Sequence, residues 1–156
     1  MTDSRLESVK RYFSEKLVAH GPTHRGVDYN STESQEVRFL QLMRIIENPA
    51  QPYSLLDFGS GYGAMYDYLL RQGHALHYVG YDIAPLMVQK GRELHSDCPD
   101  CWFTDDLAQI PVLDYAVASG TFNMKLEAEF EAWTEIILQA LNDMHNHASK
   151  GFALTC

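Results

Sequence analysis

Residues 55–70 read LLDFGSGYGAMYDYLL, in which an apolar run reaches Asp57, three glycines follow on alternate positions, and apolar residues then recur at helical spacing. Glycine weakens regular structure, and it is favoured where the backbone must turn tightly or where another group must approach it closely. The stretch therefore predicts a strand, a glycine-rich turn and a helix. The turn is the first place to expect a bound ligand.

Short apolar runs alternate with helical patterns from Tyr53 onward. Strands are predicted near residues 54–58, 77–82, 101–104, 114–119 and 151–156, and a long amphipathic helix is predicted over about 126–147. Strands that alternate with helices are typical of a parallel sheet covered on both faces. We therefore expect an α/β sandwich of three layers, with about five strands that are mostly parallel.

Two helices are predicted before this core. Residues 4–19 form the first, with Ser4 and Glu7 at the spacing of a capping box, and residues 32–46 form the second, with Thr32 and Gln35 as its capping pair. We expect residues 1–52 to be a helical extension that serves as a lid or acceptor-binding segment. Residues 53–156 would be the ligand-binding core, and the two parts would form one compact domain.

Composition and charge narrow the range of partners. The chain has 156 residues, 46% of them hydrophobic, which is enough for one globular domain with a sizeable core. Residues 1–50 hold seven Lys/Arg and seven Asp/Glu, and the remaining residues hold five and fourteen, which gives the totals of 12 and 21 and the net charge of −9. Such a surface disfavours a nucleic-acid partner. With no apolar run of about 18 residues and no signal segment, we expect a soluble, cytoplasmic protein without a membrane partner.

The next predicted strand ends in YVGYDI, which places Asp82 at the same sheet edge as Gly59, Gly61 and Gly63. Open α/β sheets bind ligands at this edge, and a carboxylate there can accept both hydroxyls of a ribose. The segment GSGYGA also fits a loose dinucleotide-binding pattern, so an NAD-dependent oxidoreductase is a lesser alternative. However, an acid at position 57 suits a ligand with an ammonium group better than a pyrophosphate.

LLDFGSGYG resembles the D-x-G-x-G-x-G first motif of class I S-adenosylmethionine-dependent methyltransferases. YDIAPLMVQKGREL is similar to the second strand and helix of that family, FTDDL to its third-strand loop and DYAVASGTFN to its fourth strand. The resemblance covers about residues 53–156. It implies a Rossmann-like fold, S-adenosylmethionine as methyl donor and S-adenosylhomocysteine as product. The family's sheet has seven strands, so we expect its last two to be absent from this chain.

The resemblance also implies cofactor contacts at matching positions. Asp57 would organise the loop around the methionine ammonium, Asp82 would bind the ribose, and Ile83 would pack on the adenine. Asp106 would accept a hydrogen bond from the adenine amino group. Asp105 stands where relatives often have glycine, so either aspartate could be the one that faces the base. The complete expected set is Asp57, Gly59, Ser60, Gly61, Gly63, Asp82, Ile83, Asp105, Asp106, Leu107, Ser119 and Phe122.

Simpler interpretations of these residues remain open. The glycines could be turn formers only, and Asp82 could be a helix cap for Ala84 and Pro85. Asp105 and Asp106 could belong to a solvated loop. A chain with these features could also be a cofactor-binding module or a partner subunit that transfers no methyl group.

Methyl transfer from a sulfonium needs positioning and exclusion of water more than a dedicated nucleophile, so no catalytic residue is predicted. SGTFN after the fourth strand does not resemble the N-P-P-Y or D-P-P-Y motif of amino-group methylases. A small molecule or a protein is therefore the expected methyl acceptor. Its candidate contacts are Arg25, Asp28, Tyr29 and Asn30, although residues 20–31 could also be only a linker.

Two further features need weighing. His95, Cys98 and Cys101 could ligate zinc or form a redox pair, but no second C-x-x-C occurs and the pair precedes a strand, so no metal site is expected. The last strand, at residues 151–156, would be an unpaired edge, and GFAL within it carries no charge or proline to block pairing. We expect a homodimer through this edge or a longer parent protein, unless an N-terminal helix folds across the gap.

Overall fold

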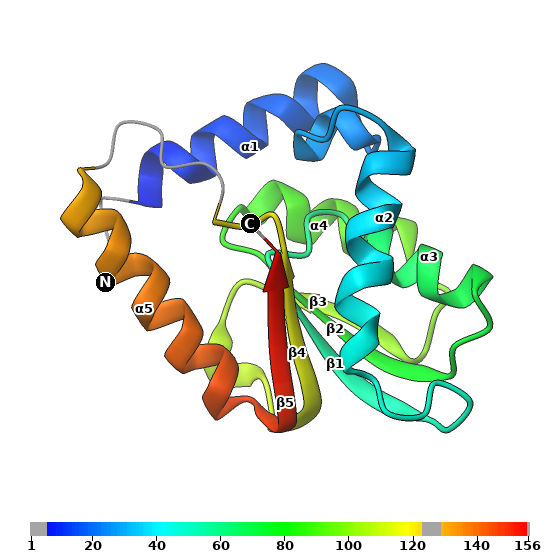
Figure 1. The fold of residues 1–156 in the computed structure, drawn as a ribbon. Helices are drawn as coiled ribbons and strands as arrows, with labels where there is room; N and C mark the ends of the chain where they lie inside the picture. Colours follow the sequence, from blue (N-terminus) through cyan, green and yellow to red (C-terminus); the bar gives the residue numbers. More distant parts are fainter. Residues whose placement is uncertain (1–5, 123–128, 156) are drawn as a thin grey trace.

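Five parallel strands form one sheet in a computed structural model that describes residues 6–122 and 129–155 (Figure 1). The order in the sheet is β3-β2-β1-β4-β5. The bounds are Tyr53–Phe58 (β1), Leu76–Tyr81 (β2), Cys101–Thr104 (β3), Leu113–Ser119 (β4) and Ala148–Thr155 (β5). The expected Rossmann-like α/β architecture is confirmed, although β5 begins earlier than the predicted residue 151.

Helices precede and connect the strands. Their bounds are Glu7–His20 (α1), Thr32–Leu42 (α2), Ala64–Arg71 (α3), Pro85–Leu94 (α4) and Phe130–Asn146 (α5), with short 3-10 turns at His24–Val27 (η2), Met43–Ile45 (η3) and Leu107–Gln109 (η4). The predicted capping pair of α2 was wrong by one residue, because the Ser31 hydroxyl accepts the Ser34 N–H at 3.0 Å. Ser4, the predicted cap of α1, lies outside the described residues. None of the described helices is long and apolar enough to cross a membrane.

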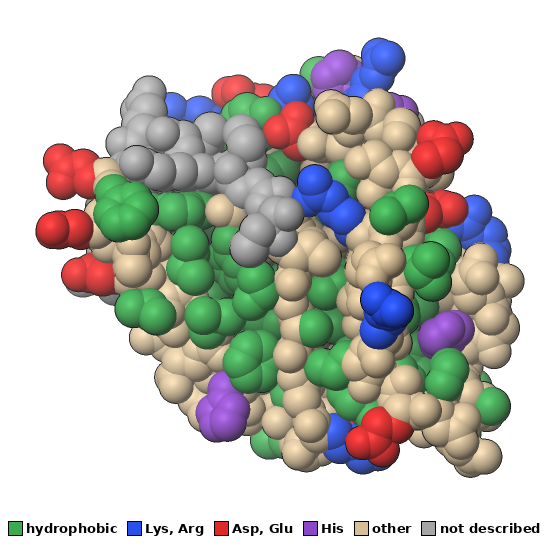
Figure 2. All heavy atoms as spheres, viewed as in Figure 1, with side chains coloured by type: hydrophobic (Ala, Val, Ile, Leu, Met, Phe, Trp, Pro, Cys, Tyr) green, Lys and Arg blue, Asp and Glu red, His purple; other side chains and the backbone are tan. Residues whose placement is uncertain are grey.

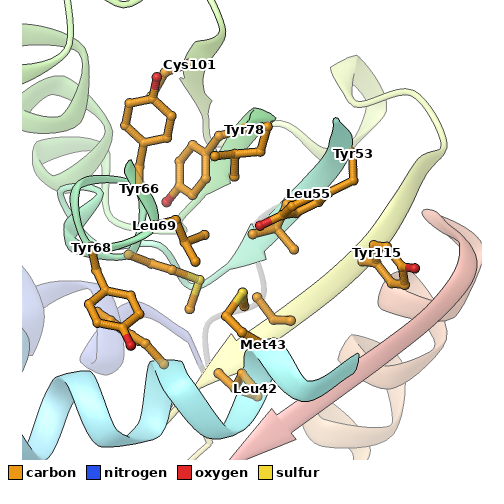
Figure 3. Close-up of a cluster of buried hydrophobic side chains, with 14 of the residues drawn as sticks. Leu42, Met43, Tyr53, Leu55, Tyr66, Tyr68, Leu69, Tyr78, Cys101 and Tyr115 are labelled. Carbon is orange, nitrogen blue, oxygen red and sulfur yellow. The ribbon is translucent and has the colours of Figure 1, made fainter. Parts of the chain in front are cut away.

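One face of the sheet packs against α2, η3, α3 and α4. Alternate residues of β1, Tyr53 and Leu55, point to this side and meet Leu42 and Met43 (Figure 3). Tyr78 from the neighbouring strand is fully buried in the same cluster. Strands buried on both faces are typical of parallel sheets, which explains why the strands read as apolar runs rather than strict alternations.

The opposite face packs against α5. Leu56, Phe58 and Val79 form a second cluster there with Ala140 and Met144 of the helix. Among the described residues β5 pairs only with β4, so its outer edge has no neighbouring strand. In Figure 2 hydrophobic side chains lie on both sides of the β5 backbone.

An N-terminal helix covers part of this region, as the alternative interpretation expected. α2 and η3 pack against β5, and a Cβ added at Gly151 would lie 3.4 Å from Ile45 Cδ1. They cover the face of the strand and leave its edge open.

The helix α1 lies across the carboxyl ends of the strands (Figure 1). Leu17 of α1 packs on Ala84 and Met87 at the start of α4, and Phe13 joins the same cluster. The edge where parallel sheets bind ligands is therefore roofed by the N-terminal segment.

Candidate functional site

A cavity of about 680 Å³ lies under this roof, bounded by the ends of β1, β2 and β4 and by α1, α2 and α5. This volume falls within the range of small-molecule sites. It brings together eight of the residues expected to bind the cofactor: Asp57, Gly59, Ser60, Gly61, Asp82, Ile83, Ser119 and Phe122.

The glycine loop needs its glycines for conformation and for packing. Gly59, Gly61 and Gly63 have φ angles of 84°, 56° and 96°, in the left-handed region that other residues rarely adopt. A Cβ at Gly59 would collide with Thr121, and one at Gly61 would collide with Val27. The turn-forming interpretation therefore holds for all three glycines, and Gly59 and Gly61 also line the cavity.

Asp82 connects the loop to the next helix. Its Oδ2 accepts the N–H of Gly61 at 2.8 Å, and its Oδ1 accepts the N–H of Ala84 at 2.9 Å. Burial raises the pKa of Asp82 to about 6. A carboxylate has about four acceptor positions, so two remain for hydroxyl donors in the cavity. The capping and ligand-binding interpretations of Asp82 are thus compatible.

Asp57 is a buried carboxyl group at the end of β1, only 3% exposed. The hydroxyl of Tyr78 donates to its Oδ2 at 2.6 Å. Burial and the nearby charge of Asp82 raise the pKa of Asp57 to about 7, against the opposing effect of the Tyr78 hydrogen bond. A cation placed next to Asp57 would stabilise its charged form.

The N-terminal segment contributes Tyr29 to the cavity. Its hydroxyl donates to the Ser119 carbonyl at 3.0 Å and lies 2.6 Å from Ser119 Oγ. Burial raises the pKa of Tyr29, so the hydroxyl stays protonated. Above its ring lies the guanidinium of Arg38, whose central carbon is 5.5 Å from the ring centroid. No sequence pattern distinguished Arg38 from a solvent-facing arginine of an amphipathic helix.

Four expected residues do not line the cavity. Gly63 is the N-cap of α3, and a Cβ there would collide with Phe103 and His95. Asp105 and Asp106 are exposed, and Asp106 caps η4 by accepting the Ala108 N–H at 3.0 Å. Leu107 packs in the cluster under α5. The positions of Asp105 and Asp106 agree with the simpler interpretation of a solvated loop.

The cysteine and histidine motif forms no metal centre among the described residues, which contain no cluster of three candidate ligands. His95 is buried, and its ring nitrogens lie 2.8 Å from the Gly91 carbonyl and 2.9 Å from Asp67 Oδ1. Both partners are acceptors, so the geometry fits a doubly protonated ring. His95 therefore ties α4 to α3 beneath the glycine loop.

Sequence comparison identifies the family. A family model described as a methyltransferase domain matches residues 56–150. The curated protein "Putative methyltransferase Rv1506c" of Mycobacterium tuberculosis is 38% identical over 115 residues, which cover 73% of this chain and 68% of that protein.

Solved structures share the fold. The N-methyltransferase NodS of Bradyrhizobium japonicum, in complex with S-adenosylhomocysteine, superposes with a TM-score of 0.64 at 16% identity, over 92% of this chain and 69% of NodS. The mycolic acid cyclopropane synthase CmaA1, also complexed with S-adenosylhomocysteine, gives 0.59 at 18% identity over 82% of this chain. This chain covers only 44% of that synthase. Fold, family model and curated relative together show that the chain belongs to the class I S-adenosylmethionine-dependent methyltransferases.

Proposed function

We propose that this chain binds S-adenosylmethionine in the cavity under α1 and transfers its methyl group to a small-molecule or protein acceptor. The observation that carries the proposal is the convergence of Asp57, the glycine loop and Asp82 on one cavity at the carboxyl edge of the sheet. In open α/β folds this edge is where ligands bind.

The donor groups fit the cofactor. The open acceptor positions of Asp82 suit the two ribose hydroxyls, and Ile83 offers an apolar surface beside them. Asp57 and the carbonyls of Gly59 and Ser119 would surround the methionine ammonium. Burial raises the pKa of the Asp57 carboxyl to about 7, and a cation beside it would stabilise the charged form of this group.

The adenine contacts remain predictions, because Asp105, Asp106 and Leu107 do not line the cavity. Both aspartates nevertheless act on a residue that lines the cavity. Burial, aided by nearby carboxylates that include these two, raises the pKa of the cavity residue Tyr81 to about 12.

The bound sulfonium would supply an activated methyl group, and the protein would position the acceptor and exclude water. The apolar side chains of Val9 and Phe13 from α1 and Trp133 from α5 close the cavity and serve the second task. The residues proposed to touch the acceptor come from the segment before α2. Asp28, Tyr29 and Asn30 line the cavity, whereas Arg25 lines a separate surface depression.

We also propose that the chain self-associates as a homodimer through the outer edge of β5. The support is the open edge among the described residues and the hydrophobic side chains beside it in Figure 2. The expected cytoplasmic location and the weak prospect of a nucleic-acid partner stay predictions from composition.

Thermal unfolding with added S-adenosylhomocysteine, S-adenosylmethionine or NAD tests the cofactor assignment. A ligand at a hundredfold excess over its Kd should stabilise the fold by about 2.7 kcal/mol. Stabilisation by the two adenosyl ligands and not by NAD is the expected result, and the reverse would support an oxidoreductase. Release of S-adenosylhomocysteine in the presence of candidate acceptors then separates an enzyme from a non-catalytic binding module.

A further inference from the structure

His95 is a buried side chain that the proposed cofactor contacts do not use, although it lies beneath the glycine loop. Its side chain is only 4% exposed, and its two ring nitrogens lie 2.8 Å from the Gly91 carbonyl and 2.9 Å from Asp67 Oδ1. A neutral imidazole has one N–H, so its other nitrogen would turn a lone pair toward one of these oxygens. The doubly protonated ring is therefore the form that satisfies both partners.

The ends of two helices favour a charged pair at this point. His95 is the C-cap of α4, where the partial negative charge of a helix end favours a cation. Asp67 lies in the first turn of α3, where the partial positive charge of a helix start favours an anion. Both effects oppose the cost of burying the imidazolium. The pair thus joins the end of α4 to the start of α3, directly after the glycine loop.

Backbone contacts connect this pair to the loop. The N–H groups of Tyr66 and Asp67 donate to the Gly63 carbonyl at 3.1 and 3.5 Å. The His95 ring also packs on Gly63, since a Cβ added there would lie 2.9 Å from His95 Cε1. The Gly63 N–H in turn donates to the carbonyl of Ser60, which lines the cavity, at 3.1 Å. A shift of the imidazole would therefore reach the loop that the cofactor touches.

The helix α4 holds the glycine loop from both of its ends. Before its first turn, Asp82 accepts the N–H groups of Gly61 and Ala84. After its last turn, His95 bonds to Asp67. Asp82 lines the cavity, whereas His95 lies outside it, so His95 can act on a ligand only through the loop.

We infer that protonated His95 is a positioning residue for the cofactor, which holds the glycine loop in its binding conformation, so that affinity falls when the imidazole loses its proton. The inference rests on the proposed function, because the ligand is the cofactor in the cavity under α1. Loss of the proton removes one of the two hydrogen bonds and the attraction to Asp67, so Gly63 is held less firmly. Affinity should therefore rise with pH as Asp82 ionises and fall at higher pH as His95 becomes neutral.

Other ionisable groups around His95 can be separated from it. Besides the bonded carboxylate, α3 contributes Tyr66, whose ring centroid lies 5.5 Å from that of His95. Burial raises the pKa of Tyr66 and that of Cys101 on β3 to about 12, so both groups keep their protons below pH 9. Arg92 of α4 donates to a backbone carbonyl of β3 and keeps its charge throughout. Cys98, whose N–H donates to the His95 carbonyl at 3.0 Å, requires a control variant.

Binding calorimetry of the whole chain between pH 5 and 9 tests the inference. The probes are S-adenosylhomocysteine and 5′-methylthioadenosine, which lacks the amino group, so that a loss of its affinity at high pH cannot come from titration of the ligand. The variants are His95→Gln, which removes the ring, and Asp67→Asn, which removes its charged partner. The controls are Cys98→Ser and His77→Gln, since His77 is half exposed and pairs with Asp100 at the surface.

In the parent, affinity for both probes should fall about tenfold from its maximum as the pH rises to 9. Asp67→Asn should move this fall to lower pH, because the imidazolium loses its counter-charge. His95→Gln should bind 5′-methylthioadenosine about tenfold more weakly than the parent near neutrality and show no further fall. Both control variants should keep the profile of the parent.

NMR of the His95 ring gives the reciprocal measurement, with its resonances identified by their absence in His95→Gln. If the cofactor binds the protonated form more tightly, bound S-adenosylhomocysteine must move the titration of the ring to higher pH. A titration that the ligand leaves unchanged, or an equal fall of affinity for 5′-methylthioadenosine in the parent and His95→Gln, would overturn the inference and leave the proposed function intact.

Failure of both probes to bind the parent at any pH would instead overturn the proposed function. The amide resonances of Gly61 and Gly63 would then test the contact between His95 and the loop alone. They should follow the titration of the ring in the parent and not in His95→Gln, and amides that do not follow it in the parent would overturn the positioning role.

Discussion

The hydroxyl of Tyr78 on β2 donates to the buried carboxyl of Asp57 on β1 across a distance of 2.6 Å. Both side chains are nearly inaccessible to solvent, so each is the other's main polar partner at this point of the sheet. Tyr78 therefore favours the charged form of Asp57, against the effect of burial.

Replacement of Tyr78 by Phe should weaken cofactor binding at pH 7, because Asp57 would then hold its proton more firmly. It should also lower the free energy of unfolding by about 1–3 kcal/mol, the usual cost of leaving a buried polar group without its partner. Calorimetry and urea unfolding measure the two effects. Tyr66→Phe is the control, because the Tyr66 hydroxyl lies near the thiol of Cys98 rather than in the cavity. Equal cofactor affinity for the parent and Tyr78→Phe would contradict this role.

Cofactor affinity should depend on pH through Asp82. Its pKa without ligand is about 6, and ribose hydroxyls donate to the ionised carboxylate, so binding should release the proton. Affinity should therefore rise from pH 5 to 7, at most about tenfold per pH unit below the pKa. Asp82→Asn should bind more weakly and remove this part of the pH profile, whereas Asp97→Asn, an equal charge change at an exposed residue outside the cavity, should preserve it.

The His95–Asp67 pair should make the free energy of unfolding fall as the pH rises above neutrality. Burial lowers the pKa of His95, but the hydrogen bonds to Asp67 and Gly91 and the Asp67 charge outweigh it and raise the pKa above 6.5. The stabilisation is thus fully present below the unfolded pKa and is lost as pH rises through the folded pKa. Urea midpoints between pH 6 and 9 should fall in the parent and change less in His95→Gln.

His77→Gln is the matched control for that experiment. His77 is half exposed and lies 3.7 Å from Asp100 at the surface, so its removal should leave the pH profile intact. A profile that is identical in the parent and in His95→Gln would show that His95 is not charged in the folded state.

Gly63 and Gly73 form a pair that separates backbone strain from packing. Both have positive φ angles, 96° and 82°, but a Cβ at Gly63 would lie 2.6 Å from Phe103 Cζ, while Gly73 faces open space. Gly73→Ala should cost about 1–2 kcal/mol, the penalty of a left-handed backbone alone. Gly63→Ala should cost about 1–3 kcal/mol more because of overpacking. Equal unfolding free energies for the two variants would refute the packing role of Gly63.

If the chain self-associates through β5, its molar mass in solution should rise with protein concentration. Light scattering should give a dimer at high concentration, and hydrogen exchange of residues 148–155 should slow as the dimer forms, while residues 53–58 at the sheet centre stay protected throughout. A soluble monomer at high concentration with residues 148–155 already protected would favour coverage of the strand by α2 and η3.

The strands could be predicted from the sequence because a strand buried on both faces of the sheet consists of consecutive apolar residues. The glycine loop could be predicted because a backbone in the left-handed region favours glycine. The early start of β5 could not be predicted, because Ser149 and Lys150 are polar and exposed and lie at a register shift between the pairs Leu113–Ala148 and Tyr115–Gly151. Arg38 lies over the ring of Tyr29, and Tyr29 bonds to Ser119; no local sequence pattern encodes these tertiary contacts. The aspartates after β3 were placed by resemblance alone, and the short η4 turn holds Asp106 as a cap.

The hydrogen bond between Tyr29 and Ser119 joins residues that are 90 positions apart. Closing so long a loop has a large entropic cost, which is recovered only once the end of β4 has a fixed position. The segment that carries Tyr29 should therefore be among the last parts of this chain to take its final place. Refolding experiments should show the sheet forming before the N-terminal segment docks, so that the ligand cavity is completed in the final step of folding.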